Sequence, residues 1–325
     1  MSRCLVTGAA GFLGQHVVER LLAHGHEVLA MVRQTADALR LRPLPARVVV
    51  ADLRAPPSLA SALQQVEIVC HCAASIPGHA DTADFQADNA TGTANIVQAA
   101  VAGGVRRVVY VSTDSVYGDA ATAPAVEDQP PDPRYFDEGE YPRSKLEGER
   151  LAQAAAVHGL EVVVLRTCLI YGPGRSPGSD FLRHWASRRL HLLWGGGGAR
   201  ISMVYASDLA DAVVLAATQP QAAGRVYNVS GGQPHSWREI LEAVGMATGR
   251  RRWLLPLPGT ALLPLAGVAH RVLQPVAPRW ATRCDPRTIR FLLADHVVDI
   301  ARIRHELGYV PQMSLTEGVR RTLAS

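Results

Sequence analysis

A glycine-rich turn between a short apolar run and a helical pattern constrains this chain more than any other feature. Residues 4–7 form the apolar run, glycines follow at positions 8, 11 and 14, and residues 12–23 have the spacing of a helix. Gly8 permits a tight turn, Gly11 lets the backbone approach a pyrophosphate, and Gly14 allows the helix to pack closely on the strand. The first amide groups of the helix and its dipole favour bound phosphate. We therefore expect a dinucleotide to contact Gly8, Ala10, Gly11, Phe12 and Leu13.

Strand-like and helix-like runs alternate through the first half of the chain, which is typical of a parallel sheet with helices on its faces. The predicted strands are residues 4–7, 27–32, 47–51, 68–72, 107–112, 161–166 and 226–229. The predicted helices are residues 12–23, 89–103, 141–158, 204–218 and 237–249. The sequence therefore predicts an α/β fold, a Rossmann-type doubly wound parallel sheet with a smaller C-terminal lobe that binds substrate.

The pattern loosens after Gly172, and this sets the predicted domains. We assign residues 1–170 with 202–229 to the nucleotide-binding domain, and residues 171–201 with 230–325 to the substrate-binding lobe. The most apolar late stretch, residues 254–276, is interrupted by prolines and by basic residues, so we do not expect it to span a membrane. It could line an apolar pocket, pack as core, form a dimer contact or touch a membrane surface.

Composition argues against several classes of protein. The 325 residues are 48% hydrophobic and 19% charged, which argues against disorder. A net charge of +4, with no basic block beyond Arg250–Arg252, argues against a nucleic-acid partner. Five cysteines without CxxC spacing and the lack of a signal-peptide apolar region at the N-terminus fit a cytoplasmic protein. Cys70, His71 and Cys72 could belong to a metal site, but zinc needs four convergent ligands, so we interpret them as a buried strand and expect no metal.

Lys145 is the only lysine of the chain, although Lys and Arg together number 33. Tyr141 precedes it by four residues, so the two side chains share one face of a helix. A free tyrosine has a pKa of ~10, and a nearby ammonium group favours its phenolate form. Such a pair can pass a proton to or from a carbonyl or alcohol oxygen, and a guanidinium group cannot imitate the compact ammonium. The pair predicts acid–base catalysis.

Polar residues follow several of the predicted strands, at the edge where open parallel sheets bind ligands. Arg33 follows the second strand, with no acidic residue before Asp37, which favours NADP over NAD because an arginine accommodates the 2′-phosphate. Asp52 follows the third strand and is placed to meet the adenine edge. Ser112 and Thr113 end the fifth strand, and the spacing alone does not decide which hydroxyl contacts the reacting oxygen.

Together these motifs resemble those of the extended short-chain dehydrogenase/reductase superfamily, over nearly the whole chain. The motifs are TGAAGFLG at 7–14, Asp52-Leu53, His71-Cys72-Ala73-Ala74, Asn89 before Gly92-Thr93, STDSVYG at 112–118, YPRSK at 141–145, Leu165-Arg166 before Tyr171-Gly172-Pro173, Tyr205 with Asp208, and Leu307-Gly308-Tyr309 with Pro311.

The resemblance implies roles for individual residues. Thr113 becomes the catalytic hydroxyl and Tyr141 the acid–base residue. Lys145 holds the nicotinamide ribose and lowers the pKa of the tyrosine, and Thr167 lies beside the nicotinamide. The further cofactor contacts that we expect are Leu53, Ala73, Ala74, Asn89 and Ser112. The superfamily also implies a homodimer.

Two departures from the superfamily's sugar-nucleotide enzymes bear on the substrate. Ser115 stands where the 4,6-dehydratases carry a catalytic glutamate, and a hydroxyl cannot replace that base. Ile201 stands where epimerases and dehydratases typically carry an arginine that grips the diphosphate, while Arg200 is one residue away. A one-residue slip on a strand turns a side chain to the opposite face. Both departures weaken the interpretation as a sugar-nucleotide enzyme.

The tail favours a particular branch of the superfamily. Residues 254–258, the apolar stretch to Val276 and residues 298–309 resemble the 3β-hydroxysteroid dehydrogenase-like branch, which includes reductases of 2-alkyl-3-oxoalkanoates. We therefore predict an NAD(P)-dependent oxidoreductase that interconverts a secondary alcohol and a ketone on a hydrophobic substrate, either steroid-like or a β-hydroxy/β-keto acyl compound. The alternatives are a nucleotide-sugar epimerase or reductase and, disfavoured by the intact Thr113, Tyr141 and Lys145, a silent NADP-binding sensor. We expect at most peripheral membrane contact.

Overall fold

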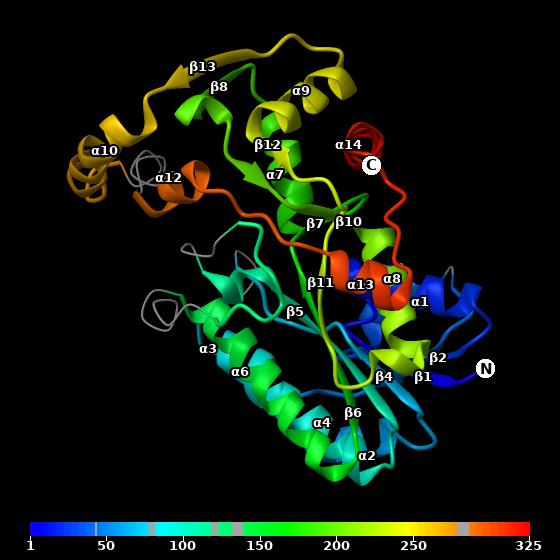
Figure 1. Ribbon diagram of the computed structural model, residues 1–325. Coiled ribbons are helices and arrows are strands. Elements are labelled where there is room, and N and C mark those ends of the chain that lie inside the picture. Colours follow the sequence, from blue (N-terminus) through cyan, green and yellow to red (C-terminus); the bar gives the residue numbers. More distant parts are fainter. Residues whose placement is uncertain (43, 78–81, 119–122, 132–138, 278–285) are drawn as a thin grey trace.

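A seven-stranded sheet forms the centre of the larger part of the molecule (Figure 1). The computed structural model describes residues 1–42, 44–77, 82–118, 123–131, 139–277 and 286–325. All strand pairings in this sheet are parallel, and the order is β11-β6-β5-β4-β1-β2-β3. The strands are β1 (Arg3–Thr7), β2 (Glu27–Val32), β3 (Arg47–Val50), β4 (Ile68–His71), β5 (Arg107–Thr113), β6 (Glu161–Thr167) and β11 (Val226–Val229). The predicted strands are confirmed, each end within one residue.

Successive residues of each strand point to opposite faces, so the sheet supports two cores. In β1, Cys4 and Val6 belong to one core and Leu5 to the other. The helices of the first face are α1 (Phe12–Ala23), α8 (Ala206–Thr218) and α13 (Ala301–Leu307). Those of the second face are α2 (Pro56–Ala62), α4 (Gly92–Ala102) and α6 (Glu140–Ala154). Helices on both faces confirm the doubly wound Rossmann-type fold.

A third core lies beyond the carboxyl ends of the sheet, in what we call the lobe. Its centre is Trp237, which contacts the rings of Phe181, Trp185 and Phe291. The helices of the lobe are α7 (Pro177–Ala186), α9 (Trp237–Thr248), α10 (Gly259–Leu273), α12 (Pro286–Leu293) and α14 (Leu315–Leu323). Its short strands are β7 (Leu169–Tyr171), β8 (Leu190–Trp194), β9 (Arg200–Ile201), β10 (Met203–Tyr205), β12 (His235–Ser236) and β13 (Trp253–Leu257).

Short helical turns complete the chain and shorten some predicted helices. They are η1 (Thr35–Leu41), α3 (Thr82–Asp84), η2 (Phe85–Thr91), η3 (Asp114–Tyr117), η4 (Ala155–His158), η5 (Gly195–Gly197) and η6 (Pro220–Ala222). The helix predicted over residues 89–103 is therefore a π-helical turn followed by α4, and residues 155–158 leave α6 as a tighter turn.

The segment that follows α12 ties the lobe to the sheet. His296 forms a bridge with Ile201 of β9, and Val298 forms one with Ala125, which precedes the sheet's helix α6. The chain then enters α13, whose Ile303 and Leu307 join the first core of the sheet. This segment therefore closes one side of the space between the sheet edge and the lobe.

Residues 254–276 divide between two elements, because β13 ends at Leu257 and α10 begins at Gly259. Pro264 lies inside α10. Within the described residues, we find no helix that combines the length and the apolarity needed to cross a membrane.

Candidate active site

One cavity of about 930 Å³ runs along the carboxyl ends of the parallel strands, between the sheet and the lobe. It collects the predicted site residues from distant parts of the sequence. The predicted residues that line it are Gly8, Ala10, Gly11, Phe12, Leu13, Arg33, Asp52, Leu53, Ala73, Ala74, Ser112, Thr113, Tyr141, Lys145 and Thr167. Of the predicted residues, only Asn89 lies outside this lining.

The glycine-rich turn has the tight geometry that its sequence predicts. Gly8 has a φ of +65°, and a Cβ atom there would lie 2.8 Å from the Cα of Ala73. A Cβ atom on Gly14 would lie 2.0 Å from the carbonyl oxygen of Gly8, so only glycine lets α1 begin this close to β1. Gly11 is the N-cap residue of α1, and no described side chain accepts a hydrogen bond from the first amide groups of this helix. This turn fits the pyrophosphate of a dinucleotide.

The far end of the cavity carries two exposed arginines. Arg33 follows β2, and Arg40 lies in η1; both line the cavity together with Asp37. Arg40 was missed from the sequence because it reaches the cavity only through the turn of η1. Asp52 also lines the cavity, and its carboxylate accepts a hydrogen bond from the backbone amide of Arg54 at 2.9 Å.

The two hydroxyls at the end of β5 have different partners. The hydroxyl of Ser112 donates to the carboxylate of Glu149 at 3.0 Å, which directs it toward α6. The Oγ1 atom of Thr113 accepts from the amide of Ser115 at 3.2 Å and lies 3.1 Å from the Ser115 hydroxyl. Both residues line the cavity, but the hydroxyl of Ser112 is tied to α6, whereas that of Thr113 bonds only within the turn that follows β5.

Tyr141 lies in the first turn of α6, and its ring contacts Phe85 with 5.8 Å between centroids. Burial raises the pKa of its phenol to about 12, the charge of Asp114 adds to the rise, and a hydrogen bond with Thr113 opposes it. This differs from the expectation that Lys145 lowers the pKa, because burial outweighs other effects on the phenol in this structure. The phenol is therefore protonated at neutral pH.

Lys145 is buried, with 2% of its surface exposed. Its Nζ atom donates to the carbonyl oxygen of Val111 at 2.7 Å and lies 4.2 Å from the ring centroid of Tyr110. Burial lowers the pKa of the ammonium group to about 7, and the negative charge of Glu149 opposes that shift. The lone lysine is thus a titratable group held inside the cavity wall.

Asp114 is a cavity residue that the sequence did not single out. Burial raises the pKa of its carboxyl group to about 7, against a hydrogen bond from Thr113 and backbone hydrogen bonds that lower it. Because Asp114 directly follows Thr113, its carboxyl group is a second titratable group beside the phenol of Tyr141. A carboxyl group whose pKa is strongly raised in a cleft is a candidate functional group.

Asn89 contributes to the site from behind the cavity wall. Its side-chain amide donates to the hydroxyl of Ser144 at 3.0 Å and to the carbonyl oxygen of Ser75 at 2.9 Å, and it accepts from the amide of Ser75 at 2.8 Å. Ser144 in turn donates to the carbonyl oxygen of Tyr141 at 2.8 Å. Asn89 therefore fixes the first turn of α6, and with it Tyr141.

A buried ion pair lies beside the carboxyl end of β5, where Ser112 hydrogen-bonds Glu149. Glu149, four residues after Lys145 on α6, pairs with Arg166 of β6, and both are at least nine-tenths buried. Arg166 also donates to the hydroxyl of Tyr117 at 3.0 Å, and that hydroxyl donates to Asn228 at 2.7 Å. With the bond from Ser112 to Glu149, the network joins α6, β5, β6, η3 and β11, so it holds β5, which carries Thr113, against α6, which carries Tyr141.

His71 belongs to a second buried network, as part of a strand. Its Nδ1 atom lies 2.7 Å from the hydroxyl of Thr7, and its Nε2 atom lies 3.0 Å from that of Thr93. Thr93 donates to the carbonyl oxygen of Asn89, so it must accept from Nε2, which makes Nδ1 the acceptor for Thr7. Burial lowers the pKa of His71 to about 3. Among the described residues we find no cluster of three or more His, Cys, Asp or Glu side chains arranged to hold a metal.

The lobe side of the cavity is largely apolar. Its apolar lining residues are Leu169, Ile170, Ile201, Phe291, Val297 and Val298, and Ile76 and Pro77, which follow β4, add to the apolar lining from the sheet side. Ile201 is a buried residue of the cavity lining, whereas Arg200 is exposed and pairs with Asp295 at 3.0 Å. The guanidinium group of Arg200 is thus engaged by a carboxylate of the cavity lining, and the predicted consequence of the one-residue slip stays a prediction.

A family model places the chain among known proteins. The model described as the NAD dependent epimerase/dehydratase family matches residues 4–230. This chain belongs to that family. It is thus an NAD(P)-dependent enzyme of the extended short-chain dehydrogenase/reductase superfamily, as its motifs predict.

Individual relatives differ in the reaction that their names state. A 2-alkyl-3-oxoalkanoate reductase of Stenotrophomonas maltophilia is 31% identical over 334 residues, covering 99% of each chain. A UDP-glucose 4-epimerase of Mycolicibacterium smegmatis is 30% identical over 342 residues, covering 99% of this chain and 97% of the relative. The solved UDP-glucose 4-epimerase of Thermus thermophilus, in complex with NAD, has a TM-score of 0.72 at 27% identity and covers 99% of this chain and 98% of its own. Identity alone does not separate the two reactions.

Proposed function

We propose that this enzyme interconverts a secondary alcohol and a ketone on a hydrophobic, steroid-like or β-hydroxy/β-keto acyl substrate. The observation that carries the proposal is the apolar lining of the lobe side of the cavity, with Ile201 where sugar-nucleotide enzymes need a cation. Apolar walls with a few polar groups suit a hydrophobic ligand whose one reactive oxygen must be oriented. The relative named a 2-alkyl-3-oxoalkanoate reductase supports the acyl class.

Chain residues divide the proton chemistry between them. When a dinucleotide is bound, its nicotinamide supplies or accepts the hydride. Thr113 hydrogen-bonds the substrate oxygen, and Tyr141 gives its proton to that oxygen as reduction proceeds. A phenol whose pKa is about 12 stays protonated at neutral pH, so it is ready to donate to a developing alkoxide. Thr167, the last residue of β6, borders the same end of the cavity.

Lys145 acts through position and charge. Its hydrogen bond to the Val111 carbonyl holds the ammonium group at the sheet edge, within reach of a bound ribose. Burial favours loss of the proton from Lys145, and the negative charge of Glu149 opposes that loss.

Arg175 offers a contact for an acidic substrate. It is an exposed residue of the cavity lining, 3.6 Å from Asp180, and it is suitably placed to meet the carboxylate of a β-keto acid.

The cofactor that we propose is NADP in preference to NAD. Arg33 and Arg40 give the adenosine end two guanidinium groups, and a 2′-phosphate takes charge-assisted hydrogen bonds from arginine. Asp37 lies in the same turn and opposes a phosphate there, so the preference is one of degree.

Steady-state turnover with a paired substrate panel tests the function. We expect oxidation of NADPH with 2-alkyl-3-oxoalkanoates or keto-steroids, and no conversion of UDP-glucose under the same conditions. Epimerisation of UDP-glucose without turnover of any apolar ketone would overturn the proposal. No turnover of either class, with intact nucleotide binding, would instead support the sensor.

The nucleotide-sugar epimerase remains the second candidate, supported by relatives that carry that name at similar identity. An epimerase regenerates its cofactor in each turnover and holds it tightly, whereas a dehydrogenase exchanges it. Denaturing the purified protein and identifying the nucleotide released distinguishes them. We expect a protein that emerges empty and binds NADPH reversibly; stoichiometric bound NAD would favour the epimerase.

A further inference from the structure

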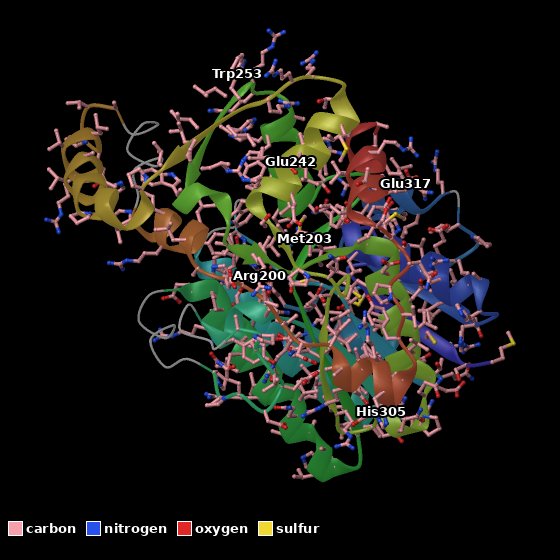
Figure 2. All side chains as sticks on the ribbon, turned by 45° about the horizontal axis from the view of Figure 1, so that its top comes forward. Arg200, Met203, Glu242, Trp253, His305 and Glu317 are labelled. Atoms are coloured by element: carbon pink, nitrogen blue, oxygen red, sulfur yellow. The ribbon has the colours of Figure 1, made fainter. Side chains whose placement is uncertain are left out.

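The outer face of the lobe carries an exposed apolar ribbon that the proposed reaction does not use. Strands β8 and β13 pair in parallel, with Trp253 opposite Leu190 and Leu255 opposite Leu192. These four side chains share one face and are exposed by 61%, 57%, 48% and 52%, respectively. Trp253 lies at the outer end of the molecule, far from the sheet (Figure 2). Contiguous exposed apolar side chains of this kind mark an interaction surface.

Buried side chains and hydrogen bonds fix the ribbon to the lobe, so its exposed face is a defined part of the structure. Its opposite face buries His191 and Leu193. Arg252, next to Trp253, turns inward and donates to the carbonyl oxygens of Trp185, Ala186 and Arg188 at the end of α7, and to the hydroxyl of Thr248 at 2.8 Å. These bonds fix the start of β13 against the body of the lobe.

Exposed arginines gather where both strands of the ribbon begin. Arg189 precedes β8, and Arg250 and Arg251 precede β13; all three are exposed. The guanidinium group of Arg251 lies 5.3 Å from the ring centroid of Trp253. Because the strands are parallel, their beginnings lie at one end, and the apolar face therefore has a cationic border.

The same segments contain no acidic residue. Residues 181–207 and 243–284 lack Asp and Glu altogether in the sequence. A second copy packed ribbon against ribbon would therefore bring arginines without carboxylates to neutralise them. A partner surface that combines apolar chains with phosphate groups would complement both the apolar side chains of the ribbon and the arginines at its border.

We propose that the ribbon of β8 and β13, with Arg189, Arg250 and Arg251, docks this enzyme on an anionic phospholipid bilayer. Trp253 and the leucines insert at the level of the headgroups, where tryptophan is favoured, and the arginines bind lipid phosphates. The contact is peripheral. Helix α10, which follows the carboxyl end of β13 (Figure 1), exposes two further apolar side chains one turn apart, Val268 and Val272.

Vesicle binding tests the docking surface without any substrate, so its failure leaves the proposed reaction untouched. The full-length protein is sedimented with vesicles of phosphatidylcholine alone and with vesicles containing about one third phosphatidylglycerol. We expect binding to the anionic vesicles that weakens as salt is raised. The double variant Trp253→Ser with Leu255→Ser should lose at least about tenfold in affinity, because its apolar insertion is gone.

Charge variants and matched controls complete the design. Arg250→Gln with Arg251→Gln should lower affinity about fivefold for each charge removed. Val157→Ser and Arg47→Gln remove an exposed apolar group and an exposed charge elsewhere, on η4 and on the edge strand β3, and should change affinity less than about twofold. Thermal unfolding verifies that each variant folds.

Three results would overturn the proposal. The first is no binding of the wild type to anionic vesicles. The second is binding that the ribbon variants and the control variants reduce equally. The third is self-association of the wild type, measured by sedimentation, that the ribbon substitutions abolish, since that would make the ribbon a contact between copies of this chain.

Discussion

The two sides of the cavity are built differently. The sheet side consists of strand ends whose polar groups are fixed by buried bonds, such as those of Ser112 to Glu149 and of Lys145 to Val111. The lobe side consists mainly of apolar side chains from short strands, from α12 and from the segment after it, among them Ile201 and Phe291. Under the proposed function, this difference means that the sheet side supplies the chemistry, whereas the lobe side selects the substrate. Substitutions on each side should therefore change different kinetic constants.

The largest effect is expected at Tyr141. Tyr141→Phe removes the proton donor while keeping the ring, so kcat should fall about 10²- to 10⁴-fold. The Kd for NADPH should stay within about twofold, because the phenyl ring still lines the cavity. Steady-state kinetics and nucleotide titration measure the two quantities. Unchanged turnover would show that the sheet side does not carry the chemistry through this residue.

The buried ion pair should dominate the stability of the sheet side. Glu149→Gln leaves Arg166 buried without its carboxylate, so the free energy of unfolding should fall by about 3–5 kcal/mol. Urea denaturation measures it. Glu147→Gln is the matched control. Glu147 is exposed on the same helix, and its carboxylate accepts a hydrogen bond from the exposed side chain of Gln86. Equal losses in both variants would contradict a special role for the buried pair.

The adenosine end should set the choice of cofactor. Arg33→Gln removes one guanidinium group facing a 2′-phosphate, so the Kd for NADPH should rise about tenfold while that for NADH changes little. Fluorescence titration with each nucleotide gives both constants. A parallel rise for NADPH and NADH would mean that Arg33 does not distinguish them.

The lobe side should respond in the opposite way to the sheet side. Phe291→Ala removes an apolar wall, so kcat/KM for the apolar ketone should fall about fivefold. The Kd for NADPH should not change, because Phe291 belongs to the lobe lining. Comparing this variant with Tyr141→Phe separates recognition from chemistry. A change in NADPH affinity without a change in substrate selectivity would break the comparison.

His71 should produce the most gradual effect, spread over several pH units. Its folded-state pKa of about 3 lies below its ordinary 6.5, so between these values the unfolded chain binds a proton that the folded chain does not. Stability should therefore fall as pH falls through this window, by up to about 1.4 kcal/mol per pH unit. Denaturation of the wild type and of His71→Gln between pH 6.5 and pH 4 measures it. The variant, although less stable at pH 7, should show the shallower slope; parallel slopes would contradict the assignment.

The sequence predicts the sheet side far better than the lobe side, for a physical reason. Gly8 and Gly14 are required by local geometry, and Tyr141 and Lys145 are brought together by a single helix, so short-range spacing suffices to find them. Parallel strands then bring their carboxyl ends to one edge, which places Arg33, Asp52 and Thr113 beside one cavity.

Long-range contacts account for what the spacing missed. The choice between Ser112 and Thr113 depends on Glu149, which lies 37 positions beyond Ser112 in the chain. Asn89 matches a cofactor motif, yet its amide is bonded to Ser75 and Ser144 behind the cavity wall. The pairing of β8 with β13 joins segments about sixty residues apart, and no local pattern announces it.

Direct detection of hydride transfer is the most decisive measurement. The wild-type enzyme is given NADPH that carries deuterium at the transferable position of its nicotinamide, together with a 2-alkyl-3-oxoalkanoate. Our account predicts one deuterium on the new carbinol carbon of the product, detected by mass spectrometry and lost in Tyr141→Phe. An unlabelled product, or an unchanged ketone while UDP-glucose is epimerised under the same conditions, would contradict it.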